Sequence, residues 1–204
     1  MELKLLRPFD QENPEFESDQ DACRLKDKWE FADESAWVIY QAKVFYESFG
    51  DPNRASELLE DGLKTALANA DLLACLAECY SRLPAKLEEA RRICDKSLAI
   101  NDQSDYAHTI MARVNLALGE PFDAYRSAMA ALMLNSSNFE AGVYLGAVGF
   151  EIAAAEGNVE EMKRSVDNLR LTLSLNPRSL RLQRIIVEKE RRLAEFRSDQ
   201  RGSL

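Results

Sequence analysis

The sequence feature that most limits the fold is a unit of two short amphipathic helices at Asp105–Asn138, with similar units on both sides. Met111 and Val114 stand three residues apart on an apolar stripe, the spacing that places side chains on one face of a helix. Gly119 ends the first helix, because glycine accepts the left-handed backbone of a helix end. Pro121 then opens the second helix, where a missing amide proton does no harm. The unit therefore predicts a helix–turn–helix.

The second helix of the unit carries a stripe of larger apolar residues beside a side made of alanines, which permits close contact with another helix. The stripe consists of Phe122, Tyr125, Met129 and Leu132, and the alanine side consists of Ala124, Ala128 and Ala131. Together with Ala112, Gly119 and the closing Leu134-Asn135, these alanines make the unit resemble a tetratricopeptide repeat.

The unit departs from that family pattern in two places. Ser136 stands where such repeats commonly have a closing proline, and Met111 with Ala112 replaces the usual leucine–glycine pair. The resemblance implies an all-α, right-handed superhelical solenoid, a fold whose usual task is to hold another polypeptide.

Similar units predict about four repeats between residues 33 and 179. They lie at about 36–69, 70–104, 105–138 and 139–179. In the fourth unit the first helix is predicted to run about two turns beyond a standard repeat. A last helix over 180–197, apolar on one side and rich in arginine on the other, is predicted to cap the array. Residues 1–32 are expected to be acidic and partly disordered, and residues 198–204 to form a disordered tail.

The net charge of −9 argues against general nucleic-acid binding, which depends on neutralising phosphates. The charge is unevenly placed. Residues 1–36 carry 11 acids and 5 bases, whereas residues 163–204 carry 11 bases and 5 acids. Solvated helix faces explain such a pattern in most proteins. The alternatives are a basic C-terminal surface for an acidic partner, or head-to-tail contact between copies.

No apolar run approaches the length of a membrane span, and the first residues lack the apolar core of a signal peptide. We therefore expect a cytoplasmic protein, whose Cys23, Cys75, Cys79 and Cys94 stay reduced and pack in the core. No CxxC pair occurs, and His108 is the single histidine, so no metal site is predicted. Without a GxSxG motif or a phosphate-binding glycine loop, the sequence predicts no catalysis and no cofactor.

The resemblance implies that the first helix of each repeat lines a concave groove, which binds the partner. By matching positions, we predict a lining of Trp37, Tyr40, Val44, Glu78, Tyr106, Thr109, Arg113, Leu116, Val143, Tyr144 and Phe150. This mostly aromatic and aliphatic set suits an apolar helical or extended segment. Arg113 is the single base in it, which argues against a clamp for a terminal carboxylate. The alternative is that the aromatic residues belong to the core.

The sequence thus predicts a non-catalytic adaptor or assembly factor. A dedicated chaperone for a secreted or membrane-active client and a structural subunit of a larger complex are the alternatives, and self-association is compatible with the charged ends. A further hypothesis is that the N-terminal segment, through Phe9 and Phe16, occupies the groove until a partner displaces it.

Overall fold

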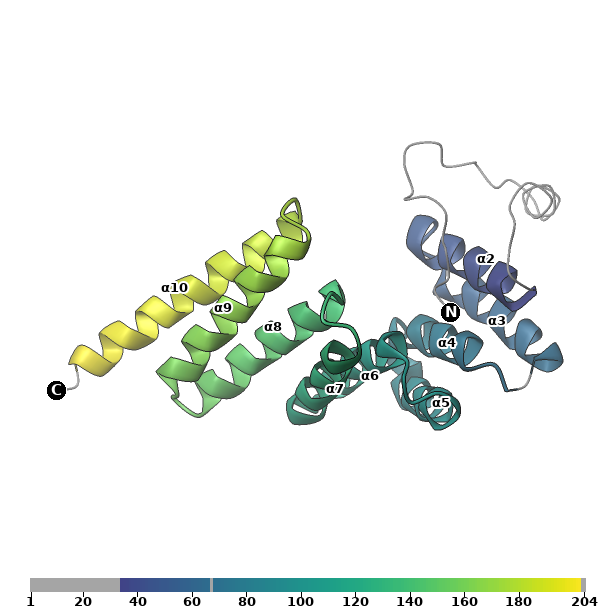
Figure 1. Ribbon diagram of the computed structural model, residues 1–204, viewed down its shortest axis with the longest axis horizontal. Coiled ribbons are helices and arrows are strands. Elements are labelled where there is room, and N and C mark those ends of the chain that lie inside the picture. The colour runs from purple at the N-terminus through teal and green to yellow at the C-terminus, as the bar shows by residue number, and fades with distance from the viewer. Residues whose placement is uncertain (1–33, 67, 203–204) are drawn as a thin grey trace.

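The computed structural model describes residues 34–66 and 68–202, and every regular element in these ranges is a helix. The helices follow one another in pairs along an arc (Figure 1). The pairs are α2 (Glu34–Ser48) with α3 (Pro52–Thr65), α4 (Ala70–Ser81) with α5 (Leu87–Ile100), α6 (Asp105–Ala117) with α7 (Pro121–Leu134), and α8 (Phe139–Ala155) with α9 (Val159–Leu175). Helix α10 (Leu180–Gly202) follows the last pair, and a short 3-10 helix, η1 (Pro84–Lys86), precedes α5. The predicted all-α solenoid is confirmed.

Residues 1–33, with Phe9, Phe16 and Cys23, lie outside the described residues. At the other end, α10 continues to Gly202, although the last helix was expected to stop at residue 197. No glycine or proline interrupts residues 178–201, and an ion pair of Arg191 with Glu195, four residues on, supports the helix. The expected disorder from residue 198 onward is therefore corrected to helix as far as Gly202.

A polar residue before each of α4, α6, α8 and α10 fixes the frame of the repeat. Its side-chain oxygen accepts a hydrogen bond from the backbone N–H three residues on, which satisfies one of the free donors of a helix start. The pairs are Asn69 with Leu72 (3.0 Å), Ser104 with Ala107 (3.1 Å), Asn138 with Ala141 (3.0 Å) and Ser179 with Leu182 (3.3 Å). Residues at equal distances from these caps occupy equivalent positions.

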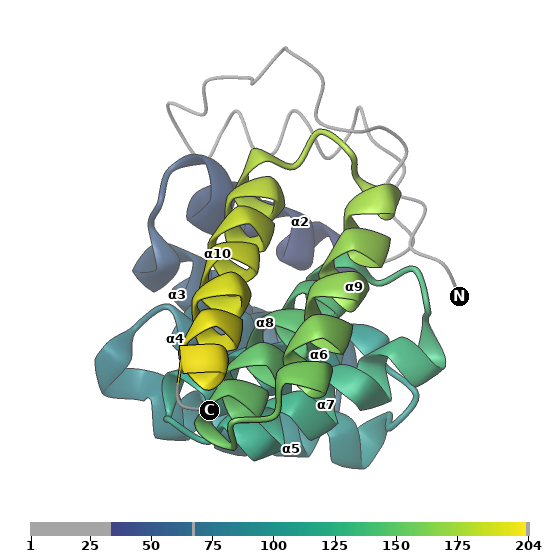
Figure 2. The same ribbon diagram turned by 90° about the vertical axis from the view of Figure 1, so that its left-hand side faces the viewer.

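The first helices of successive repeats (α2, α4, α6, α8 and then α10) contact one another directly. The second helices (α3, α5, α7 and α9) make no comparable contact with each other in the part of the chain that the structure describes. The first helices therefore form the inner side of the arc, and the second helices form its outer side. Figure 2 looks along the arc from the end at which α9 and α10 lie.

Small side chains permit close packing of the helices within and between repeats. Ala77, Ala112 and Gly146 occupy one equivalent position, eight residues after their caps, and all three are buried. At Gly146 an added Cβ atom would lie only 2.6 Å from Cγ of Leu169 in α9. The Leu145-Gly146 pair thus has a physical reason, because only glycine allows α9 to approach this closely.

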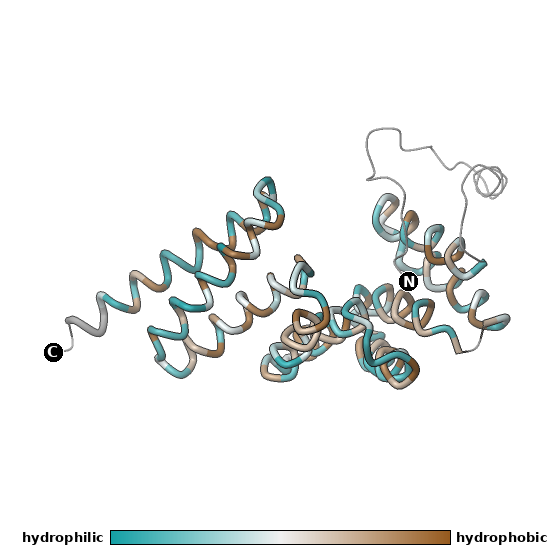
Figure 3. The backbone as a smooth tube through the Cα atoms, viewed as in Figure 1, coloured by the Kyte–Doolittle hydropathy of each residue, from teal (hydrophilic) through white to brown (hydrophobic). Residues whose placement is uncertain are grey.

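Helix α8 is the most continuous run of hydrophobic residues (Figure 3), although no helix in the described ranges is long and apolar enough to cross a membrane. Both α8 and α9 have 17 residues, compared with 13 in α6, so the extension of α8 is about one turn and not the two turns expected. The added turn of α8 places Ala153 in a cluster with Met162, and with Leu193 and Phe196 of α10. The extension therefore widens the core that holds α10.

We expect Gly146→Ala to lower the free energy of unfolding by roughly 1–2 kcal/mol, because overpacking costs more than the gain of about 1 kcal/mol in helix propensity. Urea denaturation followed by circular dichroism measures the change. In a Leu169→Ala background the added methyl group has room, so the same substitution should cost less or stabilise. An equal cost in both backgrounds would contradict the assigned clash.

Candidate functional site: the inner face of the first helices

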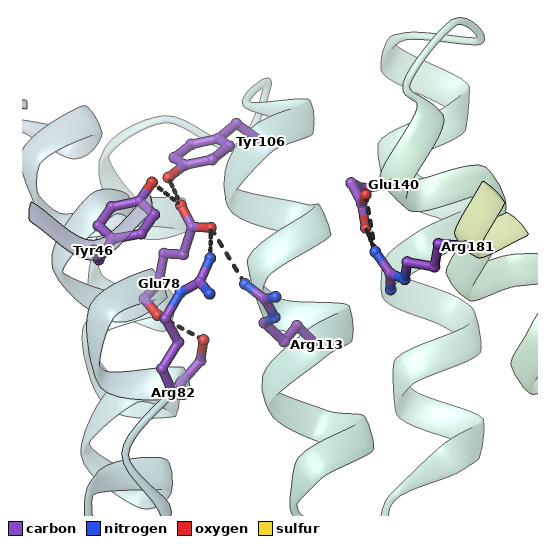
Figure 4. A network of polar contacts seen from close by, with 8 residues as sticks. Tyr46, Glu78, Arg82, Tyr106, Arg113, Glu140 and Arg181 are labelled. Atoms are coloured by element: carbon purple, nitrogen blue, oxygen red, sulfur yellow. Dashed lines mark hydrogen bonds and ion pairs between the residues drawn. The ribbon is translucent and has the colours of Figure 1, made fainter. Parts of the chain in front are cut away.

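One carboxylate joins three first helices on the inner side of the arc (Figure 4). Oε2 of Glu78 in α4 accepts hydrogen bonds from the hydroxyls of Tyr46 in α2 (2.8 Å) and Tyr106 in α6 (2.5 Å). Oε1 accepts hydrogen bonds from Arg82 in α4 (3.3 Å) and from Arg113 in α6 (3.2 Å). Both oxygens of this buried acid are therefore satisfied, and the two arginines supply its counter-charge.

The surroundings of Glu78 fix its ionisation. Burial alone would raise the pKa of the carboxyl, but the hydrogen bonds from Tyr106 and Tyr46 and the charges of Arg113 and Arg82 outweigh burial and hold that pKa below its ordinary value. Burial, followed by the charge of Glu78, raises the pKa of Tyr46, and burial raises the pKa of Tyr106 as well. An ionised acceptor thus faces two protonated donors at neutral pH.

Two cations also lie over the tyrosine rings of this network. Nζ of Lys43 is 5.0 Å from the ring centroid of Tyr106, and the Arg82 guanidinium is 4.8 Å from that of Tyr46. The side chains of Arg82 and Arg113 remain 34% and 28% exposed. Two arginines therefore contact the carboxylate, and Lys43 lies over the ring of one of its tyrosine partners.

Most of the side chains that were predicted to line an open groove are buried. Those below one tenth exposed are Trp37, Val44, Glu78, Thr109, Val143, Tyr144 and Phe150. The reason is the direct packing of consecutive first helices, which covers the inward positions of one helix with the next. Val143 packs in a cluster with Leu182 and Ile186 of α10, and Phe150 packs with Leu193.

Thr109 and Tyr144 are held in the same way between repeats. The Thr109 hydroxyl donates to the Asp105 carbonyl (2.7 Å) and accepts a hydrogen bond from Asn138 (3.0 Å), while Tyr144 packs against Ala112. Together with Val143 and Phe150, these two residues belong to the core, which corrects the expectation that they line an accessible groove.

The structure brings three predicted lining residues, Glu78, Tyr106 and Arg113, into the single network described above. Tyr40 is half-buried, and its ring stacks on that of Trp37 with the centroids 5.8 Å apart. Leu116, one turn after Arg113, is 42% exposed. Whether these side chains bind a partner stays a prediction.

Sequence reasoning missed Tyr46 and Arg82 as members of the network. Arg82 could have been found, because it follows Glu78 by four residues, the spacing at which opposite charges meet on a helix. Tyr46 lies 32 residues before Glu78, and its partner depends on how two repeats pack. No local pattern contains that information.

The outer side of α7 exposes an apolar stripe. Phe122, Met129 and Met133 are 62%, 44% and 82% exposed, at steps of seven and four residues, whereas Ala124 and Ala128 are fully buried. The stripe of larger apolar residues and the alanine side of α7, which the sequence indicated, therefore face in different directions. The alanines face the core because neighbouring helices approach closely there, and the larger residues are left at the surface.

Ion pairs join α8 to α10. Arg181 lies 3.2 Å from Glu140 (Figure 4), and Glu151 is paired with Lys189 and Arg192, each at 2.5 Å. The hydrogen bond from Arg192 is the main cause that holds the pKa of Glu151 below its ordinary value.

The described cysteines are core residues. Cys75, Cys79 and Cys94 are free and buried, and burial raises the pKa of Cys94 to about 12. The Cys94 thiol donates to the Ala107 carbonyl at 3.2 Å. Across residues 34–66 and 68–202, no group of three or more His, Cys, Asp or Glu side chains is placed to hold a metal ion.

We expect Glu78→Gln to lower the free energy of unfolding by roughly 2–4 kcal/mol, because both arginines lose the carboxylate that they share in a buried setting. Chemical denaturation at neutral pH measures the loss. Glu57→Gln is the matched control, since Glu57 is exposed on α3 and should change stability by no more than about 0.5 kcal/mol. Equal losses in the two variants would contradict the role of the network.

The loss of unfolding free energy caused by Glu78→Gln should be smaller at acid pH. A carboxyl whose pKa is lowered by folding adds stability that is fully present above its unfolded pKa, about 4.3 for Glu, and that is lost as the pH falls through the folded value. The free energies of unfolding of the wild type and of Glu78→Gln, compared at neutral pH and at about pH 3, test this expectation. A difference that stays constant over this range would show that the Glu78 charge is not its source.

Comparison with known proteins supports the repeat assignment. Residues 48–114 match the family model of the tetratricopeptide repeat. The sequence matched no curated protein.

Several solved structures share the fold. A thermophilic TPR protein of Thermus thermophilus superposes with a TM-score of 0.65 at 18% identity, covering 83% of this chain and 86% of that one. The MamA protein superposes with a TM-score of 0.56 at 18% identity, over 83% and 95% of the two chains. The first TPR domain of Spaghetti, bound to an HSP90 peptide of sequence SRMEEVD, superposes with a TM-score of 0.53 at 22% identity, over 59% and 94%.

A fold of this kind supports a protein–protein interaction module, and such repeats are generally non-catalytic. Residues 48–114 are therefore similar to the tetratricopeptide repeat, and the chain as a whole shares the helical-repeat fold of the solved structures.

Proposed function

We propose that the protein is a non-catalytic, cytoplasmic adaptor or assembly factor, which binds one partner polypeptide along the inner side of α2, α4, α6 and α8. The Glu78 network carries this proposal. By joining α2, α4 and α6 through one carboxylate, it holds their inner faces in a fixed arrangement before any partner arrives. A surface fixed in advance loses less conformational entropy on binding, and so retains more of the contact energy as affinity.

The accessible groups on this face indicate the chemistry of the partner. Leu116 of α6 offers an exposed apolar side chain, and Tyr40 of α2 is half-buried. Lys43, Arg82 and Arg113 add donors and positive charge. We therefore favour an apolar segment, helical or extended, that also presents carboxylate or carbonyl acceptors. The peptide bound by the related Spaghetti domain supports a polypeptide partner in general terms.

The test is affinity purification from the native cell with mass spectrometry, comparing Leu116→Glu with Met133→Glu. Both substitutions place a charge at an exposed leucine or methionine of a helix, Leu116 on the inner side and Met133 on the outer side. We expect Leu116→Glu to lose the partner and Met133→Glu to keep it. The reverse result would move the interface to the outer face of α7 and overturn the proposal.

Two other functions remain as alternatives, a dedicated chaperone for a secreted or membrane-active client and a structural subunit. A chaperone should release its client and keep it soluble, whereas a subunit should stay with its complex in a fixed ratio. Pulse–chase labelling in cells, followed by purification of the complex, measures how fast the bound partner is exchanged. An adaptor should exchange its partner without changing the partner's solubility.

A further inference from the structure

The helix caps reveal which face of α10 would meet a further helix. Ser179 caps α10 as Asn138 caps α8, so residues 41 positions apart are equivalent. In α8, the positions that face the next first helix are Val143, which packs with Leu182 and Ile186, and Phe150, which packs with Leu193. The corresponding face of α10 is therefore turned away from α8.

Arginines occupy that face of α10. The equivalents of Val143 and Phe150 are Arg184 and Arg191, and both are exposed. Arg181 and Arg192 stand at the positions of Glu140 and Glu151. These two turn toward α8, where they pair with Glu140 and Glu151, so we call only Arg184 and Arg191 the basic face of α10. Where earlier repeats present apolar side chains to a neighbour, α10 presents positive charge.

Most of this charge is only loosely neutralised. Arg191 is paired with Glu195 of α10 itself, whose side chain is 57% exposed, and the side chain of Glu188, which lies between Arg184 and Arg191 in the sequence, is 50% exposed. Exposed pairs of this kind are weak and exchange readily with other acids. Among the described residues, Arg184 has no ion-pair partner.

Exposed apolar side chains lie beside this charge. Leu180 and Val187 are 65% and 66% exposed, at steps of four and three residues on either side of Arg184. The surface therefore combines positive charge with apolar area. A suitable occupant carries acids together with a few large apolar residues.

The chain itself contains a segment of that composition. Residues 1–33 carry ten acids and five bases, and Trp29 and three phenylalanines are among them. They precede α2, which lies at the opposite end of the arc from α10 (Figure 1). We propose that the basic face of α10 binds residues 1–33 of a second copy, so that copies associate head to tail. Each copy then offers one acidic segment and one basic face, and such contacts form open chains unless the rotation between copies closes a ring.

The test is sedimentation velocity of the full chain over a range of concentrations. At about 50 mM salt the mean mass should rise with concentration, and at about 0.5 M salt it should return to that of the monomer, because exposed charge contacts are screened. Arg184→Glu with Arg191→Glu should weaken association tenfold or more, and Glu12→Lys with Glu15→Lys and Glu17→Lys should do the same. Combining both sets restores opposite charges and should restore assembly.

A matched control separates the basic face from net charge. Arg92→Glu with Arg126→Glu makes the same change in charge at exposed residues of α5 and α7, and should leave association unchanged. Circular dichroism establishes that every variant is folded. A wild-type protein that stays monomeric at low salt overturns the proposal, as does a control that weakens association equally. These readouts need no partner protein, so the outcome is independent of the adaptor function.

Discussion

Direct contact between consecutive first helices is the constraint on which the rest of this structure depends. It requires small residues where the helices meet, as at Ala112, which packs against Tyr144 of α8, and it buries the inward positions that a more open array would expose. A charged residue in such a place must find all of its partners within the protein. Glu78 does so by drawing on α2, α4 and α6 at once, and the contact between first helices and the buried network are therefore two aspects of one packing arrangement.

The repeat frame could be read from the sequence because its signals are local. Gly119 has a positive φ of 80°, as its helix-ending role requires, and Asn138 caps α8 through its own side chain. The exposure of the inner face could not be read in the same way, because it depends on how closely successive repeats pack. Phe150 illustrates this limit, since its spacing suits a groove and a core equally until Leu193 is placed against it. For the same reason, no local pattern indicated that the longer α8 serves to hold α10.

The two surfaces assigned here differ in the side chains that form them. The inner face is fixed by buried polar contacts, and its accessible groups, such as Leu116 and Arg113, stand on helices that cannot shift independently. The basic face of α10 instead rests on exposed arginines, of which Arg191 makes a weak ion pair with Glu195. The first is suited to a specific partner held in one geometry, and the second to contacts that respond to ionic strength.

The Glu78 network also bears on how the array unfolds. Repeat proteins are usually described by the stability of each repeat and its contact with the next, which allows repeats to open one by one from either end. Here one carboxylate in the second repeat binds the first repeat through Tyr46 and the third through Tyr106, so none of the three can leave without exposing a buried charge. The α2–α7 part should consequently open as one cooperative unit, whereas α8–α10, with clusters of their own, can exchange their amide protons separately.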